Sequence, residues 1–173
     1  GFMKSGTQAS RVALTFLFVL FPVIASAEEI SKISYPDTAW IMISSALVML
    51  MLPGLALFYG GMVRRKNVLS TLMHSFIPLG VITIQWVLFG YSLAFGNDIG
   101  HFIGDLSKVL FIGIDYQTLS GTIPEYLFSM FQLMFAIITV ALISGGMAER
   151  VDFKAYIIFI FVWSTVVYDP ICH

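Results

Sequence analysis

Long runs of apolar residues without a charge dominate the pattern along this chain. No Asp, Glu, Lys or Arg occurs in residues 38–62, 67–96 or 126–148. Each run exceeds the roughly 20 residues that a helix needs to cross about 30 Å of hydrocarbon. A fourth run, 155–168, is shorter, but the flexible side chain of Lys154 can reach the membrane interface and extend it. The runs are continuous and do not alternate with polar residues, which favours helices over the strands of a barrel.

This pattern predicts an all-α fold, a polytopic membrane helix bundle. Small residues recur four positions apart, as in Ala56 and Gly60, and such pairs let helix backbones approach closely in lipid. The membrane-spanning helices are expected at about 38–62, 68–96, 124–148 and 153–170.

The beginning of the chain has the features of a secretory signal peptide. Met3 can serve as the initiator, positive charges follow it, and residues 12–24 are apolar. Residues 25–27, Ala-Ser-Ala, have the small-x-small form that signal peptidase accepts.

The alternative is an uncleaved first membrane helix, but the apolar run is short for a span and Pro22 interrupts it. We therefore expect a cleaved signal peptide over 1–27, which includes the two extra leading residues Gly1 and Phe2, and a membrane domain over 28–173.

The Lys and Arg residues predict how the spans are oriented. The loops 63–66 and 149–154 together carry five of them, whereas only Lys32 and Lys108 lie on the opposite side of the bundle. By the positive-inside rule, the two loops face the cytoplasm. The mature N-terminus is then outside, as expected for a multi-pass protein of the cell (inner) membrane whose signal peptide is cleaved. The five residues are Arg64, Arg65, Lys66, Arg150 and Lys154.

Composition narrows the function further. Apolar residues make up 58% of the chain and charged residues 11%, against about 45–50% and about 25% in soluble domains. The net charge of −1 provides no basic surface for phosphates, so we expect no nucleic-acid partner. Cys172 is the only cysteine, and the three histidines lack the spacing of a metal site. Because no catalytic motif occurs either, we expect no enzyme, metal or cofactor.

Several polar and aromatic residues lie inside the predicted spans. His74 and Gln85 are interpreted first as helix–helix hydrogen-bonding groups, and so is Gln132, although its aromatic neighbours raise its functional interest. Phe131 and Phe135, together with Phe128, share one helix face. From spacing alone this stripe fits either ordinary packing or stacked rings that cap a narrow pore and attract a cation.

Four segments of the chain resemble a known family. They are residues 53–70 (PGLALFYGGMVRRKNVLS), 86–96 (WVLFGYSLAFG), 131–150 (beginning Phe-Gln and ending GGMAER) and 163–173 (ending YDPICH). In this order they resemble ammonium transporters of the Amt, Mep and Rhesus type, from about residue 37 to the end. The resemblance implies the first four helices of an eleven-helix fold with a pore through each subunit of a homotrimer.

The resemblance also implies a substrate and a path for it. Ammonium would be recruited at an outer aromatic gate and passed as ammonium or ammonia into the cytoplasm. Phe131 and Phe135 match the paired phenylalanines of that gate, and Gln132 lies between them. The remaining expected path residues are Leu55, Phe58 and Tyr59 near the inner part, and Leu142 and Tyr168.

The implied partners are ammonium or ammonia, membrane lipid, two further copies of the chain, and a PII-type regulatory protein on the cytoplasmic face. The paired pore histidines of the family match no position in this chain. Two alternatives to a transporter stay open: an ammonium sensor with a C-terminal signalling domain on the same fold, and a membrane scaffold without a pore.

Overall fold

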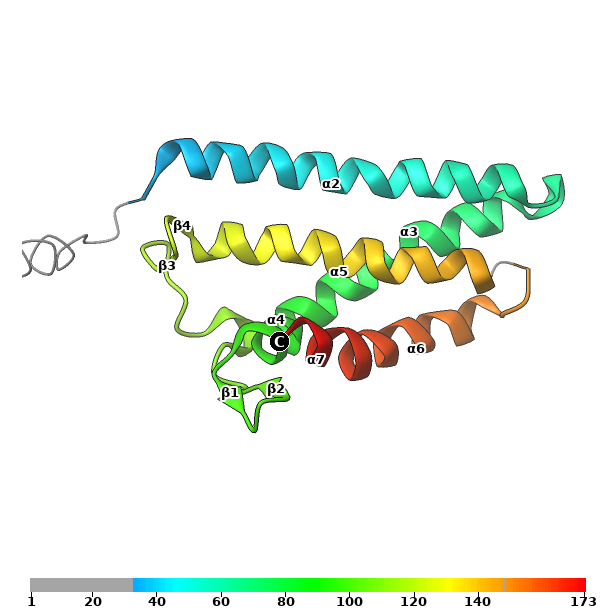
Figure 1. Ribbon diagram of the computed structural model, residues 1–173. Coiled ribbons are helices and arrows are strands. Elements are labelled where there is room, and N and C mark those ends of the chain that lie inside the picture. Colours follow the sequence, from blue (N-terminus) through cyan, green and yellow to red (C-terminus); the bar gives the residue numbers. More distant parts are fainter. Residues whose placement is uncertain (1–32, 148) are drawn as a thin grey trace, which may run out of the picture. The chain divides into compact units, whose positions relative to one another are not determined.

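The computed structural model describes residues 33–147 and 149–173. Within this part, helices dominate (Figure 1). The first long helix is α2, Tyr35–Met62, and the third is α5, Glu125–Met147. The second is continuous from α3 (Val68–Gln85) through a π turn (Trp86–Gly90) into α4 (Tyr91–Phe95). The fourth likewise joins α6 (Phe153–Trp163), a π turn (Ser164–Tyr168) and α7 (Asp169–Cys172).

All four helices are long and apolar enough to cross a membrane. The prediction of an all-α polytopic membrane bundle is therefore confirmed. The expected signal peptide over 1–27 lies outside the described residues.

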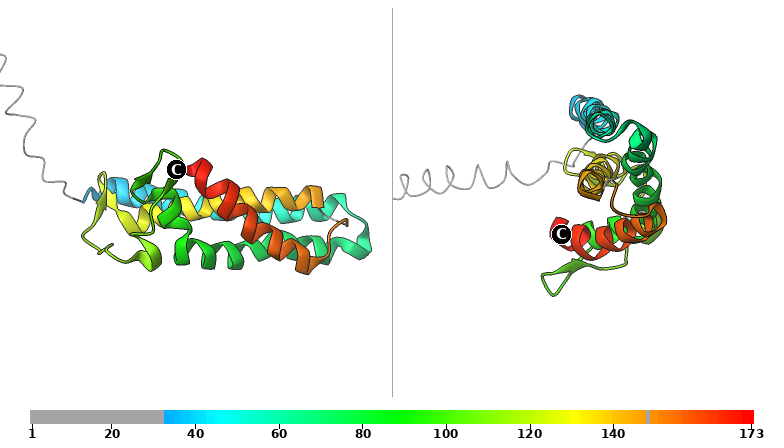
Figure 2. Two further views of the ribbon diagram at one scale, coloured as in Figure 1. Left: turned by 90° about the horizontal axis from the view of Figure 1, so that it is seen from below. Right: turned by 90° about the vertical axis from the view of Figure 1, so that its right-hand side faces the viewer.

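The helix α3 organises the packing. It contacts α2, α5 and α6, and α5 also packs on α2. The end-on view in Figure 2 shows α2, α5 and α6 ranged along one side of α3. The side of α5 that faces away from α3 is therefore left uncovered by the described helices.

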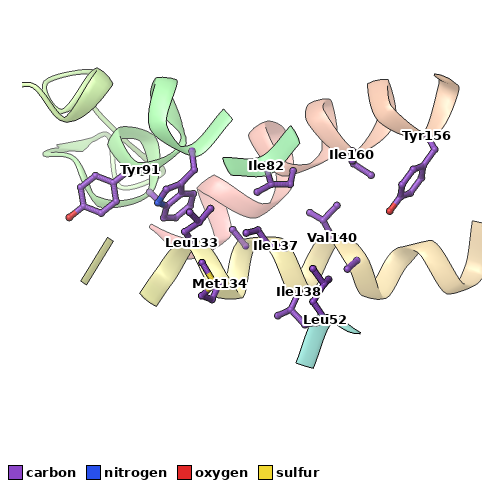
Figure 3. Close-up of a cluster of buried hydrophobic side chains, with 14 of the residues drawn as sticks. Leu52, Ile82, Tyr91, Leu133, Met134, Ile137, Ile138, Val140, Tyr156 and Ile160 are labelled. Carbon is purple, nitrogen blue, oxygen red and sulfur yellow. The ribbon is translucent and has the colours of Figure 1, made fainter. Parts of the chain in front are cut away.

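The buried core lies where α3, α5 and α6 meet (Figure 3). On α5 the buried positions follow the three- and four-residue spacing of one helix face, from Leu133 through Ile137 to Ser144. Ala136 and Ala141 are completely buried, and their small side chains let neighbouring helices approach. Ile82 of α3 and Ile160 of α6 fill the remaining space from the other side.

A long loop joins α4 to α5. It contains two short antiparallel pairs, β1 (Asp98–Ile99) with β2 (Ile103–Gly104) and β3 (Leu119–Ser120) with β4 (Ile123–Pro124). A 3₁₀ turn, Val109–Phe111, lies between them.

Contacts with buried side chains fasten this loop to the helices. Lys108 Nζ lies 2.6 Å from Glu125 Oε1 at the start of α5, and Tyr91 Oη donates to the same carboxylate oxygen at 2.8 Å. Ser92 Oγ donates to the backbone oxygen of Asp105 at 2.7 Å. The loop is thus held over the ends of α4 and α5.

The two loops at the other end of the bundle are joined by Glu149. Its Oε1 accepts from Asn67 Nδ2 at 2.8 Å and from the backbone N–H of Arg64 at 3.3 Å. The hydrogen bond from Asn67, followed by that from Arg64, lowers the pKa of the Glu149 carboxyl. The two basic loops of the sequence therefore lie at one end of the bundle, on a common side.

Candidate functional site

Phe131 and Phe135 form a pair on α5. Their ring centroids are 5.0 Å apart and their planes meet at 83°, an edge-to-face arrangement. The four-residue spacing brings the two rings together on one side of the helix. Phe135 is 37% exposed, so part of this aromatic pair faces away from the bundle core.

Phe128, one turn earlier, has a different partner. Its ring packs edge-on against Phe95 at a centroid distance of 5.1 Å. Phe95 in turn stacks on Tyr91. Phe128 therefore belongs to an aromatic cluster beneath the long loop, although it shares the helix face that the spacing predicts.

Leu142 continues the stripe of Phe131 and Phe135. The three positions span only about 40° of the helix circumference. Leu142 is 51% exposed. Gln132 lies to one side of this stripe and is half-buried. Phe135 and Leu142 are therefore exposed on this face of α5, whereas Ile138, which lies between them on the same face, is buried.

Tyr59 links α2 to the Leu142 end of this face of α5. Its hydroxyl donates to the backbone oxygen of Leu142 at 3.0 Å, although the two residues are 83 positions apart. Its ring covers Gly145, where a Cβ atom would lie 2.4 Å from Cζ of the ring. The structure therefore brings together two of the predicted path residues, Tyr59 and Leu142.

The other predicted path residues are more scattered. Phe58 is 62% exposed and its ring lies 5.7 Å from that of Tyr59. Leu55 is half-buried against the core. Tyr168 packs near Trp86, with ring centroids 6.4 Å apart. It belongs to neither the Phe131–Phe135 pair nor the Tyr59–Leu142 contact.

An apolar groove of about 560 Å³ lies between α2 and α5. Four of its eleven lining residues are methionines: Met42, Met49, Met130 and Met134. None of the predicted path residues lines it. Across residues 33–147 and 149–173, no group of three or more His, Cys, Asp or Glu side chains is placed to hold a metal ion.

The intramembrane polar residues behave in different ways. Gln85 forms the expected bond between helices, since its Nε2 donates to Asp169 Oδ2 at 2.6 Å. Within residues 33–147 and 149–173, His74 makes no hydrogen bond to another helix, and its buried Nε2 has no partner. Its Nδ1 bonds to the backbone oxygen of Ser70 in its own helix at 2.7 Å, and its ring packs against Phe153 and Tyr156.

Asp169 was not among the predicted site residues. In the sequence it lies at the end of the last predicted span, where an acidic side chain is usually solvated. A sequence pattern that could have indicated Asp169 is the presence of one carboxyl, Asp169, and one amide, Gln85, in two of the apolar spans, which could pair with each other.

These features define the class: a multi-pass membrane protein built as a helix bundle. Residues 39–173 match the model of the Ammonium Transporter Family. The chain belongs to this family.

Relatives and solved structures agree with this assignment. The chain is 49% identical over 154 residues to an ammonium transporter of Mycobacterium tuberculosis (strain H37Rv), covering 79% of this chain and 32% of that protein. It is 51% identical over 141 residues to the ammonium transporter of Bacillus subtilis (strain 168), covering 79% and 34%. The chain thus spans about a third of the length of the curated relatives it matches.

The crystal structure of Candida albicans Mep2 superposes with a TM-score of 0.74 at 33% identity, covering 86% of this chain and 33% of that one. A protein described as a sensor Amt protein superposes with a TM-score of 0.71 at 23% identity, covering 79% of this chain and 33% of that one, which shows the common fold alone.

Proposed function

We propose that this chain forms the first four membrane helices of a channel that carries ammonium or ammonia into the cytoplasm. The family match over residues 39–173 is the observation that carries the proposal. The exposure of Phe135 and Leu142 on one face of α5 supports it, because a conduction path needs side chains that the neighbouring helices leave uncovered.

The aromatic pair suits the first step, which is recruitment of the ammonium cation. Moving a bare cation into an apolar passage is very costly, so part of its water shell must be replaced at the entrance. Aromatic rings present negative faces, and one such contact is worth about 0.5–2 kcal/mol. Phe131 and Phe135 pack edge to face, and the partial exposure of Phe135 lets a cation reach the pair.

Tyr59 and Leu142 suit the inner part of the path. The hydroxyl of Tyr59 is engaged by the backbone of Leu142, so this tyrosine presents mainly its ring and fixes the spacing of α2 and α5. Leu55 and Phe58 add apolar surface on the same helix. An apolar passage favours neutral ammonia over the cation, and the proton must then be handled by other parts of the protein.

The arrangement in the membrane follows from the charges. The loops that Glu149 joins carry the basic residues, and we place them in the cytoplasm of a cell whose inner membrane holds the protein. The start of α2 then faces outside, after removal of the signal peptide. Assembly as a homotrimer and docking of a PII-type regulator on the cytoplasmic loops complete the proposal.

Uptake of methylammonium tests the gate directly. In cells that lack other ammonium uptake systems, the full-length protein should support uptake. We expect Phe131→Ala and Phe135→Ala each to lower it about tenfold, the effect of losing about 1.4 kcal/mol of cation attraction.

Met130→Ala is the matched control, because Met130 lies on the same turn of α5 but lines the groove toward α2. Uptake that is unchanged in both phenylalanine variants would contradict the gate, and a full-length protein that supports none would contradict transport.

The sensor alternative shares the fold with the sensor Amt protein above. The same assay separates the two functions. A sensor would bind ammonium without net uptake, and its variants would change a downstream signal and leave the methylammonium content of the cell unaltered.

A further inference from the structure

A buried carboxyl and a buried amide meet between the second and fourth long helices. Asp169 and Gln85 are both 0% exposed. Gln85 Nε2 donates to Asp169 Oδ2 at 2.6 Å and makes a longer contact with Thr165 Oγ1 at 3.4 Å. Neither residue belongs to the proposed path.

Within residues 33–147 and 149–173, each member of this pair has one oxygen without a hydrogen-bond partner. These atoms are Gln85 Oε1 and Asp169 Oδ1, both buried and both acceptors in the ionised form of the pair. A buried acceptor without a donor is destabilising. One added proton on Asp169 would let its O–H donate to Gln85 Oε1, which would satisfy both atoms at once.

The surroundings provide no positive charge. Among residues 33–147 and 149–173, no Lys, Arg or His nitrogen lies within 4.0 Å of the Asp169 carboxyl oxygens. The groups beside it are Gln85 and Thr165, which are neutral, and the ionisable Tyr168 and Cys172 of its own segment, which can add only negative charge. An unpaired carboxylate inside a membrane span is costly, and the neutral acid avoids that cost.

Both helices depart from regular α-helical geometry at this point. A π turn, Trp86–Gly90, directly follows Gln85, and a second one, Ser164–Tyr168, directly precedes Asp169. Such turns occur frequently at functional sites. Gly90 makes room for the amide, because a Cβ atom there would lie 2.7 Å from Gln85 Oε1. The backbone is thus shaped around the pair.

We propose that Asp169 and Gln85 form an intramembrane proton-binding site. Asp169 is held as a carboxylic acid whose O–H donates to Gln85 Oε1, while Gln85 Nε2–H donates to Asp169 Oδ2. The ligand is a single proton, and the reciprocal pair joins the second and fourth helices without a net charge. The site does not depend on the proposed transport function.

Infrared spectroscopy of the full-length protein in lipid at neutral pH tests the protonation state. The difference between wild type and Asp169→Asn should contain the C=O band of one protonated carboxyl. The control, Asp115→Asn, removes an exposed loop carboxyl and should instead lose carboxylate bands. Carboxylate bands lost in Asp169→Asn would overturn the proposal and would indicate a bound cation or water.

Two further measurements test the reciprocal pairing. Asp169→Asn places an amide N–H donor where the acid has its O–H, so this variant should assemble and retain the thermal stability of wild type. Its failure to assemble would overturn the proposal. In Gln85→Leu the acid should persist, with its C=O band at higher frequency because the N–H donor is lost. A band at the wild-type position would overturn the pairing.

Discussion

At Gly90, the absence of a side chain leaves room for a buried polar pair, Gln85 and Asp169. Gln85 occupies the space where a Cβ atom would be, and the Gln85 amide is fixed by Asp169. We expect Gly90→Ala to displace the amide and to lower the free energy of unfolding by about 1–3 kcal/mol, as overpacking does elsewhere. The thermal unfolding midpoint of the solubilised full-length protein measures this.

Gly80→Ala is the control for this change, since nothing in the described part of the chain lies within 4 Å of a Cβ at that position. Equal midpoints for the two alanine variants would show that the amide is not confined.

Asp105 is a second residue whose local contacts predict a measurable property. Hydrogen bonds from the Ser107 and Asn97 side chains lower the pKa of its carboxyl to about 2. A carboxyl whose pKa is lowered in the folded state stabilises the folded loop at pH values above its unfolded-state pKa of about 3.9. This stabilisation is lost as the pH falls through the folded-state pKa. Protection of the loop amides from hydrogen exchange should therefore decrease as the pH is lowered from about 4 to about 2.

In Asp105→Asn the same amides, Asn97 and Ser107, should already be less protected at neutral pH, because both donate to this carboxylate. Unchanged protection in the variant would show that Asp105 does not stabilise the loop through these hydrogen bonds.

Between the elements, the contact of α2 with α5 depends on Tyr59. Tyr59→Phe removes the hydrogen bond to the Leu142 backbone and should cost about 1 kcal/mol of stability. Gly145→Ala should cost more, because its methyl group would meet the Tyr59 ring itself. Unfolding midpoints again measure both changes.

Gly146→Ala is the matched control one residue along, where no described atom lies within 4 Å of the added group. A Gly145→Ala variant as stable as this control would show that the Tyr59 ring does not hold the two helices together.

The elements differ in how far the sequence predicts them. The long helices follow from apolar runs because a membrane requires every backbone group to bond within its own segment. The proximity of Phe131 and Phe135 follows from helical spacing. The π turns, and the contact of Tyr59 with a backbone oxygen 83 residues away, depend on tertiary packing that no local pattern encodes. His74 illustrates the same limit, because a polar side chain in a helix can bond to its own backbone.

For the whole molecule, the basic loops define a common side. Glu149 joins them through Asn67 and Arg64, and the long loop with Tyr116 lies at the opposite end of the helices. We expect a membrane-impermeant thiol reagent added to intact cells to label Tyr116→Cys and to spare Lys66→Cys. Wild type, whose Cys172 is half-buried, gives the background. Labelling of Lys66→Cys in intact cells would reverse the proposed orientation.

Transport by the purified full-length protein is the most direct test of the central claim, that these helices form part of an ammonium path with an aromatic entrance. In liposomes containing only this protein, an inward ammonium gradient should drive entry well above that of empty liposomes. The double variant Phe131→Ala/Phe135→Ala should lose most of this entry, while Met130→Ala retains it. Entry no faster than in empty liposomes, or entry by the double variant equal to that of wild type, would contradict the account.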